Sequence, residues 1–258
     1  MGTGLTGWKH ARGLAVTRRP IARTGTARGG IRCVSHAGAA RVAQGRAGYE
    51  TSKKQCCCTR RMEKKLPEML AAIAQPEAVK GRRLRLMFQD EARFGRMVRI
   101  RRCWARTKVR PVVCNGYERQ FVYVYGAVSP WTGDVDWKIT RQMNTEQMSA
   151  FLAQVSTAHA EDFIIMVVDG ASSHVCKDLV VPENIRLLRL PPYSPELNPQ
   201  EHLWDELREK EFPNRVFSDL DGVIPQLEKG LPRLASQKET VCNITGWPWI
   251  ISLNLNAT

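Results

Sequence analysis

Residues 163–169 read FIIMVVD, an uninterrupted apolar run that ends in a carboxylate. Such a run without alternation is typical of a strand that is buried on both faces of a sheet. The stretch LRLMFQD at residues 84–90 is a short, largely apolar run that also ends in a carboxylate. Because ligands of sheets with parallel strands gather at the carboxyl ends of those strands, we expect Asp90 and Asp169 to lie close together. The alternative is that each Asp merely caps a turn.

The segments around these two runs predict the other elements of the fold. The pattern indicates a helix at 64–74, a hairpin of strands at 120–128 and up to 140, a short helix at 172–180 and a strand at 185–190. A helix expected at 145–158 has Asn144 as its N-cap and one apolar face, formed by Met148, Phe151, Leu152 and Val155. Another helix starts after Asn198, with Pro199 at its first position, and runs to about 211, and a helical region at 219–235 is interrupted by Pro225 and Pro232. This order suits a mixed sheet covered by helices, with a parallel part built from strand–helix–strand crossovers. The expected fold class is therefore α/β.

Charge and composition divide the chain into parts. Residues 1–60 contain twelve Lys or Arg and a single acidic residue, Glu50, so they carry +11 of the net charge of +14. They lack helical or strand periodicity, which predicts a disordered basic arm at 1–61 that either binds a polyanion such as DNA or is only a solvated tail. A linker helix is expected at 62–82 and one folded domain at 83–258.

Several classes of protein are disfavoured by the sequence. None of the eight cysteines forms a C-x-x-C pair, and Cys33, His36 and the run Cys56–Cys58 lack a second spaced pair of the kind that binds zinc. No apolar run reaches the roughly 18 residues that span a bilayer, so no membrane association is expected. The start of the chain has no secretory signal pattern, which favours a cytoplasmic location with reduced thiols.

The carboxylates indicate metal chemistry. Two acids at one sheet edge need a cation, and oxygen ligands without a nearby His or Cys favour Mg²⁺ or Mn²⁺ over zinc. Glu201, at the start of a helix expected to pack on the sheet, would complete a site for two ions of the kind that supports in-line phosphoryl transfer. The alternative for Glu201 is a capping-box role at the helix start, three residues after Asn198.

Three segments carry a family resemblance: FQDEARFG (88–95), VVDGASSH (167–174) and LPPYSPELNPQEHLWDEL (190–207). They resemble the motif blocks of mariner-type DDE transposases, in the branch carried by bacterial insertion sequences. The resemblance implies an RNase H-like fold, with Asp90, Asp169 and Glu201 as the catalytic and metal-binding acids. Glu91 is a weaker candidate, because it should point to the opposite face of the strand. We expect Trp204 to belong to the packing face of its helix.

The resemblance also implies a reaction and its partners. Relatives cut double-stranded DNA at the ends of their element and join the freed 3′-hydroxyl to target DNA, as a homodimer on the DNA and without a small-molecule cofactor. The chain would then act in a bacterium, associated with the nucleoid. By the same resemblance, arginines of the 96–110 insertion are expected to contact DNA phosphates. The alternative is that this insertion is only a solvated, charged hairpin. The resemblance also implies that two further side chains orient groups beside the acids. These residues are Arg99, Arg101, Arg102 and Arg106 for DNA, and His174 and Asn198 for orientation.

The sequence departs from the family pattern in three places. Gly170 stands where many relatives have Asn, and only 31 residues separate Asp169 from Glu201. Residues 1–60 show no helix-turn-helix modules, so we expect a transposase whose DNA-binding region is missing or replaced. One rival hypothesis is a catalytically silent remnant that binds DNA non-specifically or pairs with full-length subunits. Another is a general RNase H-like nuclease, against which the 190–207 block argues.

Overall fold

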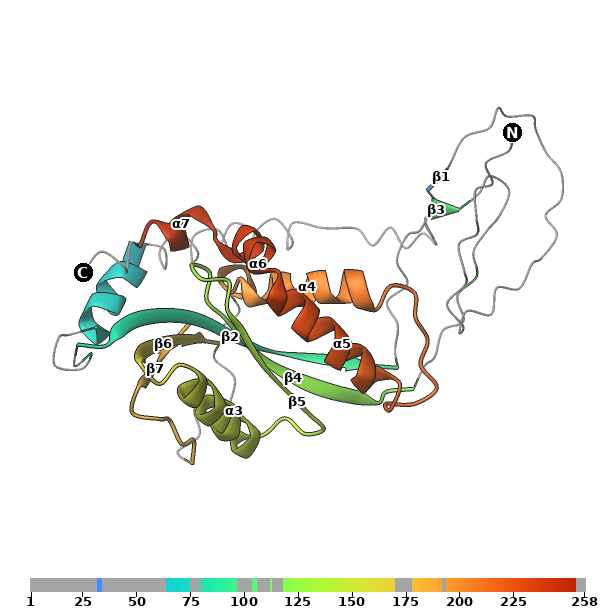
Figure 1. The fold of residues 1–258 in the computed structure, drawn as a ribbon, viewed down its shortest axis with the longest axis horizontal. Coiled ribbons are helices and arrows are strands. Elements are labelled where there is room, and N and C mark those ends of the chain that lie inside the picture. The colour runs from blue at the N-terminus through green and yellow to red at the C-terminus, as the bar shows by residue number, and fades with distance from the viewer. Residues whose placement is uncertain are drawn as a thin grey trace, which may run out of the picture.

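A five-stranded mixed sheet with helices on both faces forms the centre of the molecule (Figure 1). The computed structural model describes residues 32–33, 64–74, 79, 81–96, 104–105, 112, 118–169, 178–191 and 194–253. The strand order is β5-β4-β2-β6-β7, and the strands are β2 (Arg83–Gly95), β4 (Phe121–Val128), β5 (Val135–Thr140), β6 (Asp162–Val168) and β7 (Ile185–Arg189). The expected α/β, RNase H-like sheet is confirmed.

Strand β2 is longer than the sequence pattern predicts. We expected it to end at Asp90, but it continues to Gly95. The reason is that its two neighbours stop at different places: parallel pairing with β6 ends at Phe88, whereas antiparallel pairing with β4 extends from Phe88 to Gly95. Asp90 therefore lies inside a strand, just beyond the point where the parallel neighbour ends.

The predicted hairpin is present as β4 and β5. Its turn is closed by a hydrogen bond from the Ser129 amide to the Asp134 carbonyl and another from the Gly133 amide to the Ser129 carbonyl, both 2.9 Å. Gly133 has φ of 68°, a conformation that side chains disfavour, and a Cβ there would lie 2.4 Å from the Lys238 carbonyl oxygen. Glycine is thus required for the turn to approach the C-terminal helices.

Helix α3 (Thr145–Ala158) covers one face of the sheet. Asn144 caps it as predicted, since its side chain accepts a hydrogen bond of 2.9 Å from the Gln147 amide. The four predicted apolar residues of α3 are all buried, and they pack with strand residues of that face. The buried set on α3 is Met148, Phe151, Leu152 and Val155.

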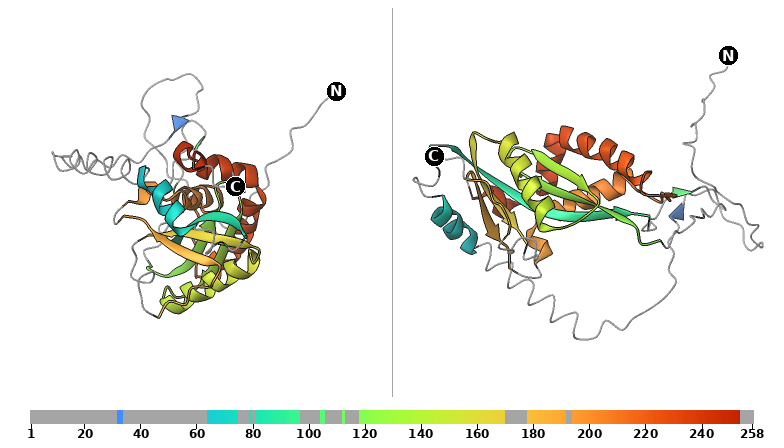
Figure 2. Two further views of the ribbon diagram at one scale, coloured as in Figure 1. Left: turned by 90° about the vertical axis from the view of Figure 1, so that its left-hand side faces the viewer. Right: turned by 90° about the horizontal axis from the view of Figure 1, so that it is seen from below.

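The opposite face carries the C-terminal helices, so that the strands lie between them and α3 (Figure 2). They are α4 (Gln200–Glu211), α5 (Val223–Ser236), α6 (Lys238–Thr245) and α7 (Pro248–Ile251), preceded by the 3₁₀ turn η2 (Pro195–Leu197). The helix of residues 64–73 places Leu66 and Leu70 in the same core. Both expected interruptions are wrong, because α5 begins at Val223, contains Pro225 in its first turn and continues through the exposed Pro232.

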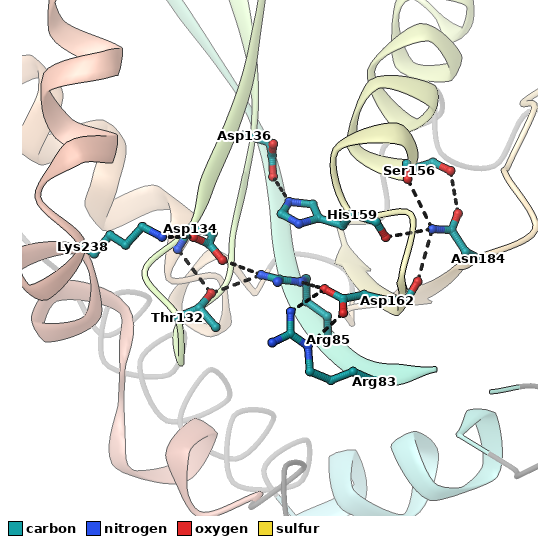
Figure 3. Close-up of polar contacts among 10 residues, drawn as sticks. All are labelled: Arg83, Arg85, Thr132, Asp134, Asp136, Ser156, His159, Asp162, Asn184 and Lys238. Carbon is teal, nitrogen blue, oxygen red and sulfur yellow. Dashed lines mark hydrogen bonds and ion pairs between the residues drawn. The ribbon is translucent and has the colours of Figure 1, made fainter. Parts of the chain in front are cut away.

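A chain of ion pairs joins the starts of β2 and β6 to the hairpin turn (Figure 3). Arg83 and Arg85 both donate to Asp162, and Arg85 also donates to Asp134 at 2.6 Å. Lys238 of α6 completes the set through a 2.7 Å bond to Asp134. Burial opposes the ionisation of Asp162 and of Asp134, but the bonds from their basic partners outweigh it and hold the pKa of each carboxyl below its usual value.

Asn184 lies between the C-terminal end of α3 and the start of β6 and is bonded to both. Its side-chain nitrogen lies within hydrogen-bond distance of the carbonyls of Ser156, His159 and Asp162, and Ser156 Oγ donates to its oxygen at 2.6 Å. These bonds hold the end of α3 against the start of β6. None of the helices in the described part of the chain is long and apolar enough to span a bilayer.

Little of the N-terminal arm and of the Arg-rich insertion is described. Strand β1 (Arg32–Cys33) pairs antiparallel with β3 (Trp104–Ala105), and the two make a separate small sheet. The helix expected at 172–180 also lies largely outside the described residues, and residues 178–180, which are described, are not helical.

Candidate active site

Asp90 is a buried acid on the face of the sheet that carries α4. Its residue exposure is 8%, and its neighbours on that side of β2 are core residues such as Phe88 and Ala92. It pairs across the ladder with Gly126 of β4. The carboxylate therefore sits under the C-terminal helices, not on an open surface.

Asp169 follows β6 directly, at the same edge of the sheet as Asp90. The last parallel pair is Phe88 with Val167, and two residues further along each chain come Asp90 and Asp169. Since side chains alternate between the faces of a strand, Asp169 shares the face of Val167, which is the face of Asp90. Neighbouring strands run about 4.8 Å apart, so the register brings the two acids together.

Glu201 lies in the first turn of α4, and Asn198 fixes where that turn sits. The Asn198 side chain donates to the Gln89 carbonyl of β2 at 2.8 Å and accepts from the Gln200 amide at 3.1 Å. The helix begins at Gln200, one residue later than predicted, although Asn198 still satisfies an amide of its first turn. Among the described residues, no capping-box bond joins Glu201 to the Asn198 amide.

Trp204 binds Asp90 directly, a contact that the sequence reading missed. Its indole Nε1 donates to Asp90 Oδ2 at 2.9 Å. The ring is 1% exposed, so the predicted packing role is also present. A Cβ on Gly126 would lie 2.4 Å from the ring, so only glycine lets the indole lie over β4. The sequence did contain a sign of this contact: a buried tryptophan needs a partner for its N–H, and Trp204 lies one helical turn after Glu201, an acid predicted to belong to the site.

Negative charge accumulates around Asp90. Burial raises the pKa of Asp90 well above its usual value, and the charge of Glu201 raises it further, followed by that of Glu91. The hydrogen bond from Trp204 opposes these effects, and Asp169 adds a smaller upward contribution. Glu201 and Asp169 are thus both close enough to influence Asp90.

Glu91 lies next to Asp90 but on the other face. Alternation along β2 places it on the α3 side, where its charge adds to the effect of burial and raises the pKa of Tyr125 to about 12. The expectation that Glu91 points away from the face of Asp90 agrees with this position.

The oxygen ligands present suit a hard cation. In the described residues, no group of three His, Cys, Asp or Glu side chains lies close enough together to hold one metal ion. Mg²⁺, however, is usually held by one or two carboxylates plus waters and substrate phosphates. Asp90 and Asp169, on one face of the sheet and both two residues past the last parallel pair, fit that requirement by their chemistry, because a cation would relieve the repulsion that Asp169 and Glu201 exert on the Asp90 carboxylate.

Several predicted residues lie outside the described part of the chain. They are His174, the arginines Arg99, Arg101, Arg102 and Arg106, Gly170, and the cysteines of the arm apart from the backbone of Cys33.

Residues 85–224 match the family described as DDE superfamily endonuclease, which is more than half of the chain and includes all three acids. The chain belongs to the DDE superfamily endonucleases. It is 34% identical over 134 residues to the uncharacterized protein y4pE/y4sA of Sinorhizobium fredii (strain NBRC 101917 / NGR234), an alignment that covers 50% of this DDE endonuclease chain and 96% of that relative.

The fold of this DDE endonuclease is similar to that of a solved transposase. A crystal structure of a pre-cleavage Mos1 transpososome matches with a TM-score of 0.54 at 12% identity, over 78% of this chain. A Mos1 mariner paired end complex with Mn matches with a TM-score of 0.48 at 14% identity, over 75% of this chain. The match spans 63% of the transposase chain in each case, so it covers part of that protein's length.

Proposed function

We propose that the chain is the catalytic part of a DNA transposase, in which Asp90, Asp169 and Glu201 together hold two Mg²⁺ or Mn²⁺ ions. One observation supports the proposal: the parallel register of β2 and β6 ends two residues before Asp90 and Asp169, on the same face of the sheet, and the charges of Glu201 and Asp169 both raise the pKa of Asp90. Membership of the DDE superfamily endonucleases supports it. The three acids are otherwise remote in sequence.

The reaction would be cleavage of phosphodiester bonds at the ends of a mobile element, followed by transfer of the freed 3′-hydroxyl to target DNA. When bound, divalent ions supply activation of the attacking oxygen and stabilisation of the leaving oxygen. The chain's own residues orient the ligands: Trp204 donates a hydrogen bond to one oxygen of Asp90, and Asn198 anchors the start of α4, which carries Glu201, to β2. Burial by α4 keeps bulk water from Asp90.

Double-stranded DNA is the proposed partner, and a homodimer the proposed assembly on it. The net charge of +14 suits a polyanion, and the structure with the similar fold is described as a transpososome. Arg99, Arg101, Arg102 and Arg106 remain the proposed phosphate contacts, and His174 a proposed orienting residue. A DNA substrate would associate the chain with the bacterial nucleoid.

A nicking assay tests the catalytic proposal. Supercoiled duplex DNA is incubated with the protein in Mg²⁺ or Mn²⁺, alongside Asp169→Ala and a control variant, Glu228→Ala, whose exposed acid lies on α5. We expect the unsubstituted protein and the control to nick the DNA, and Asp169→Ala to lose activity by about 100-fold or more while its circular dichroism is unchanged.

The rival is a catalytically silent chain that binds DNA non-specifically or pairs with full-length subunits. It is favoured by the finding that no three metal-binding side chains cluster in the described residues. DNA binding without any nicking in either metal would support this rival, as would equal nicking by the unsubstituted protein and Asp169→Ala, because the activity would then not come from these acids.

A further inference from the structure

Two glutamine side chains are fully buried without a hydrogen bond. Gln89 and Gln200 are both 0% exposed, and neither the Nε2 nor the Oε1 of either residue has a partner in the described part of the structure. Burying an amide in this way carries a free-energy penalty, because its hydrogen bonds to water are lost and not replaced. A polar group kept under such conditions calls for an explanation.

Gln200 lies on the Asp90 face of the sheet. It is the first residue of α4, directly before Glu201, and Trp204 follows it by one helical turn. A Cβ on Gly126 would lie 2.6 Å from Gln200 Nε2 and 2.4 Å from the Trp204 ring, so both side chains lie over the same position of β4. Gly126 is the ladder partner of Asp90. The amide of Gln200 is therefore next to the Asp90–Trp204 pair.

Gln89 provides the contrast. It precedes Asp90 on β2, so strand alternation sends its side chain to the opposite face, with Met87 and the residues that pack on α3. The two glutamines thus share burial and lack of partners but differ in the face on which they lie.

We propose that the side-chain amide of Gln200 is a further polar group of the cation site, with Oε1 accepting a hydrogen bond from the water shell of a divalent ion held by Asp90. This inference rests on the proposed function. Mg²⁺ keeps several of its waters when it binds to proteins, and those waters need acceptors. The Gln200 amide, which lies over the ladder partner of Asp90, would supply such an acceptor without adding negative charge to Asp90, whose carboxylate already has the charges of Glu201, Glu91 and Asp169 around it.

The test compares Gln200→Met with Gln89→Met. Each change removes two unpartnered polar atoms at nearly constant volume, so the metal-free forms of both variants should unfold at the same temperature as the unsubstituted protein or higher. Mn²⁺ affinity is measured by electron paramagnetic resonance titration, independently of nicking. We expect Gln200→Met to weaken Mn²⁺ binding by about 10-fold to 100-fold and Gln89→Met to leave it unchanged.

Gln200→Glu adds a second line of evidence. It retains an oxygen acceptor and adds a negative charge, so Mn²⁺ affinity should equal or exceed that of the unsubstituted protein, in contrast to Gln200→Met. Gln200→Leu, which also removes both amide atoms, replaces Gln200→Met if the latter fails to fold, and it should weaken Mn²⁺ binding to the same extent. Equal Mn²⁺ affinity in Gln200→Met and the unsubstituted protein would overturn the inference alone, as would an equal loss in Gln89→Met. Absence of Mn²⁺ binding to the unsubstituted protein would overturn the proposed function and the inference with it.

Discussion

At the scale of single residues, Trp204 has two roles: its ring is buried in the core, and its N–H donates a hydrogen bond to Asp90. A buried carboxylate surrounded by other acids tends to take up a proton, and the indole N–H favours the ionised form that a cation requires. The same ring fills the core between α4 and Phe94, with the two ring centroids 6.2 Å apart. One side chain therefore stabilises the fold and orients an acid.

Trp204→Phe separates these two roles, because it keeps an aromatic ring and removes the N–H. We expect nicking to slow by about 10-fold to 100-fold and the free energy of unfolding to fall by about 1–3 kcal/mol. Rates come from the supercoiled DNA assay and stabilities from urea denaturation. Trp131→Phe, in the hairpin turn, makes the same chemical change elsewhere and should leave the rate unaltered. An unaltered rate in Trp204→Phe would mean that the bond has no part in catalysis.

The sequence identifies the acids but not their immediate contacts. Asp90, Asp169 and Glu201 stand out because apolar runs and a distinctive block surround them. The bond between Trp204 and Asp90 joins residues 114 positions apart, so it depends on how α4 docks on the sheet. The burial of Gln200 depends on the same docking, and a polar residue at a helix start gives no sign of it.

At the scale of elements, length and continuity differ most from the sequence prediction. A run of apolar residues predicts where β2 begins, but its end depends on β4, whose paired residues are 26 to 40 positions further along the chain (121 − 95 and 128 − 88) and whose antiparallel pairing extends the strand to Gly95. Helix α5 continues through Pro232, which is on its exposed side, and α6 and α7 were not predicted. Short helices near the C-terminus are held by burial of single residues such as Val241 and Ile250, which short patterns do not reveal.

The buried ion pair of Arg85 and Asp162 should make the fold sensitive to acid. The side chains are 7% and 5% exposed, and the pKa of Asp162 is held below the ordinary 3.8. Because the folded state binds this proton less readily than the unfolded state, the pair stabilises the fold above about pH 4, and that stabilisation is lost as pH falls through the folded pKa. Asp162→Asn should cost about 3–5 kcal/mol at pH 7.

Denaturation of both proteins between pH 7 and pH 2 checks this expectation. The difference in unfolding free energy between the unsubstituted protein and Asp162→Asn should shrink as the pH falls below about 4. Asp221→Asn is the control, since the Asp221 pair with Arg141 is exposed and should contribute less than about 1 kcal/mol at any pH. A difference in unfolding free energy that stays constant from pH 7 to pH 2 would show that the charge of Asp162 does not stabilise the fold.

At the scale of the whole molecule, the two faces of the sheet differ in role. Helix α3 covers one face with an apolar core, whereas α4 to α7 cover the other, where the start of α4 is bonded to β2 through Asn198 and Gln89 (Figure 1). The sequence predicts this class of fold from the order of its elements. It does not by itself fix the register of β2 against β6, which decides whether Asp90 and Asp169 meet.

The central claim is that Asp90, Asp169 and Glu201 share divalent cations. Anomalous diffraction from crystals soaked in Mn²⁺ tests it most directly. We predict anomalous peaks within bonding distance of carboxylate oxygens from all three residues, and loss of those peaks in Asp169→Ala crystals soaked in the same way. A well-ordered site without Mn²⁺ among the three acids, or ions bound only elsewhere on the protein, would contradict the account.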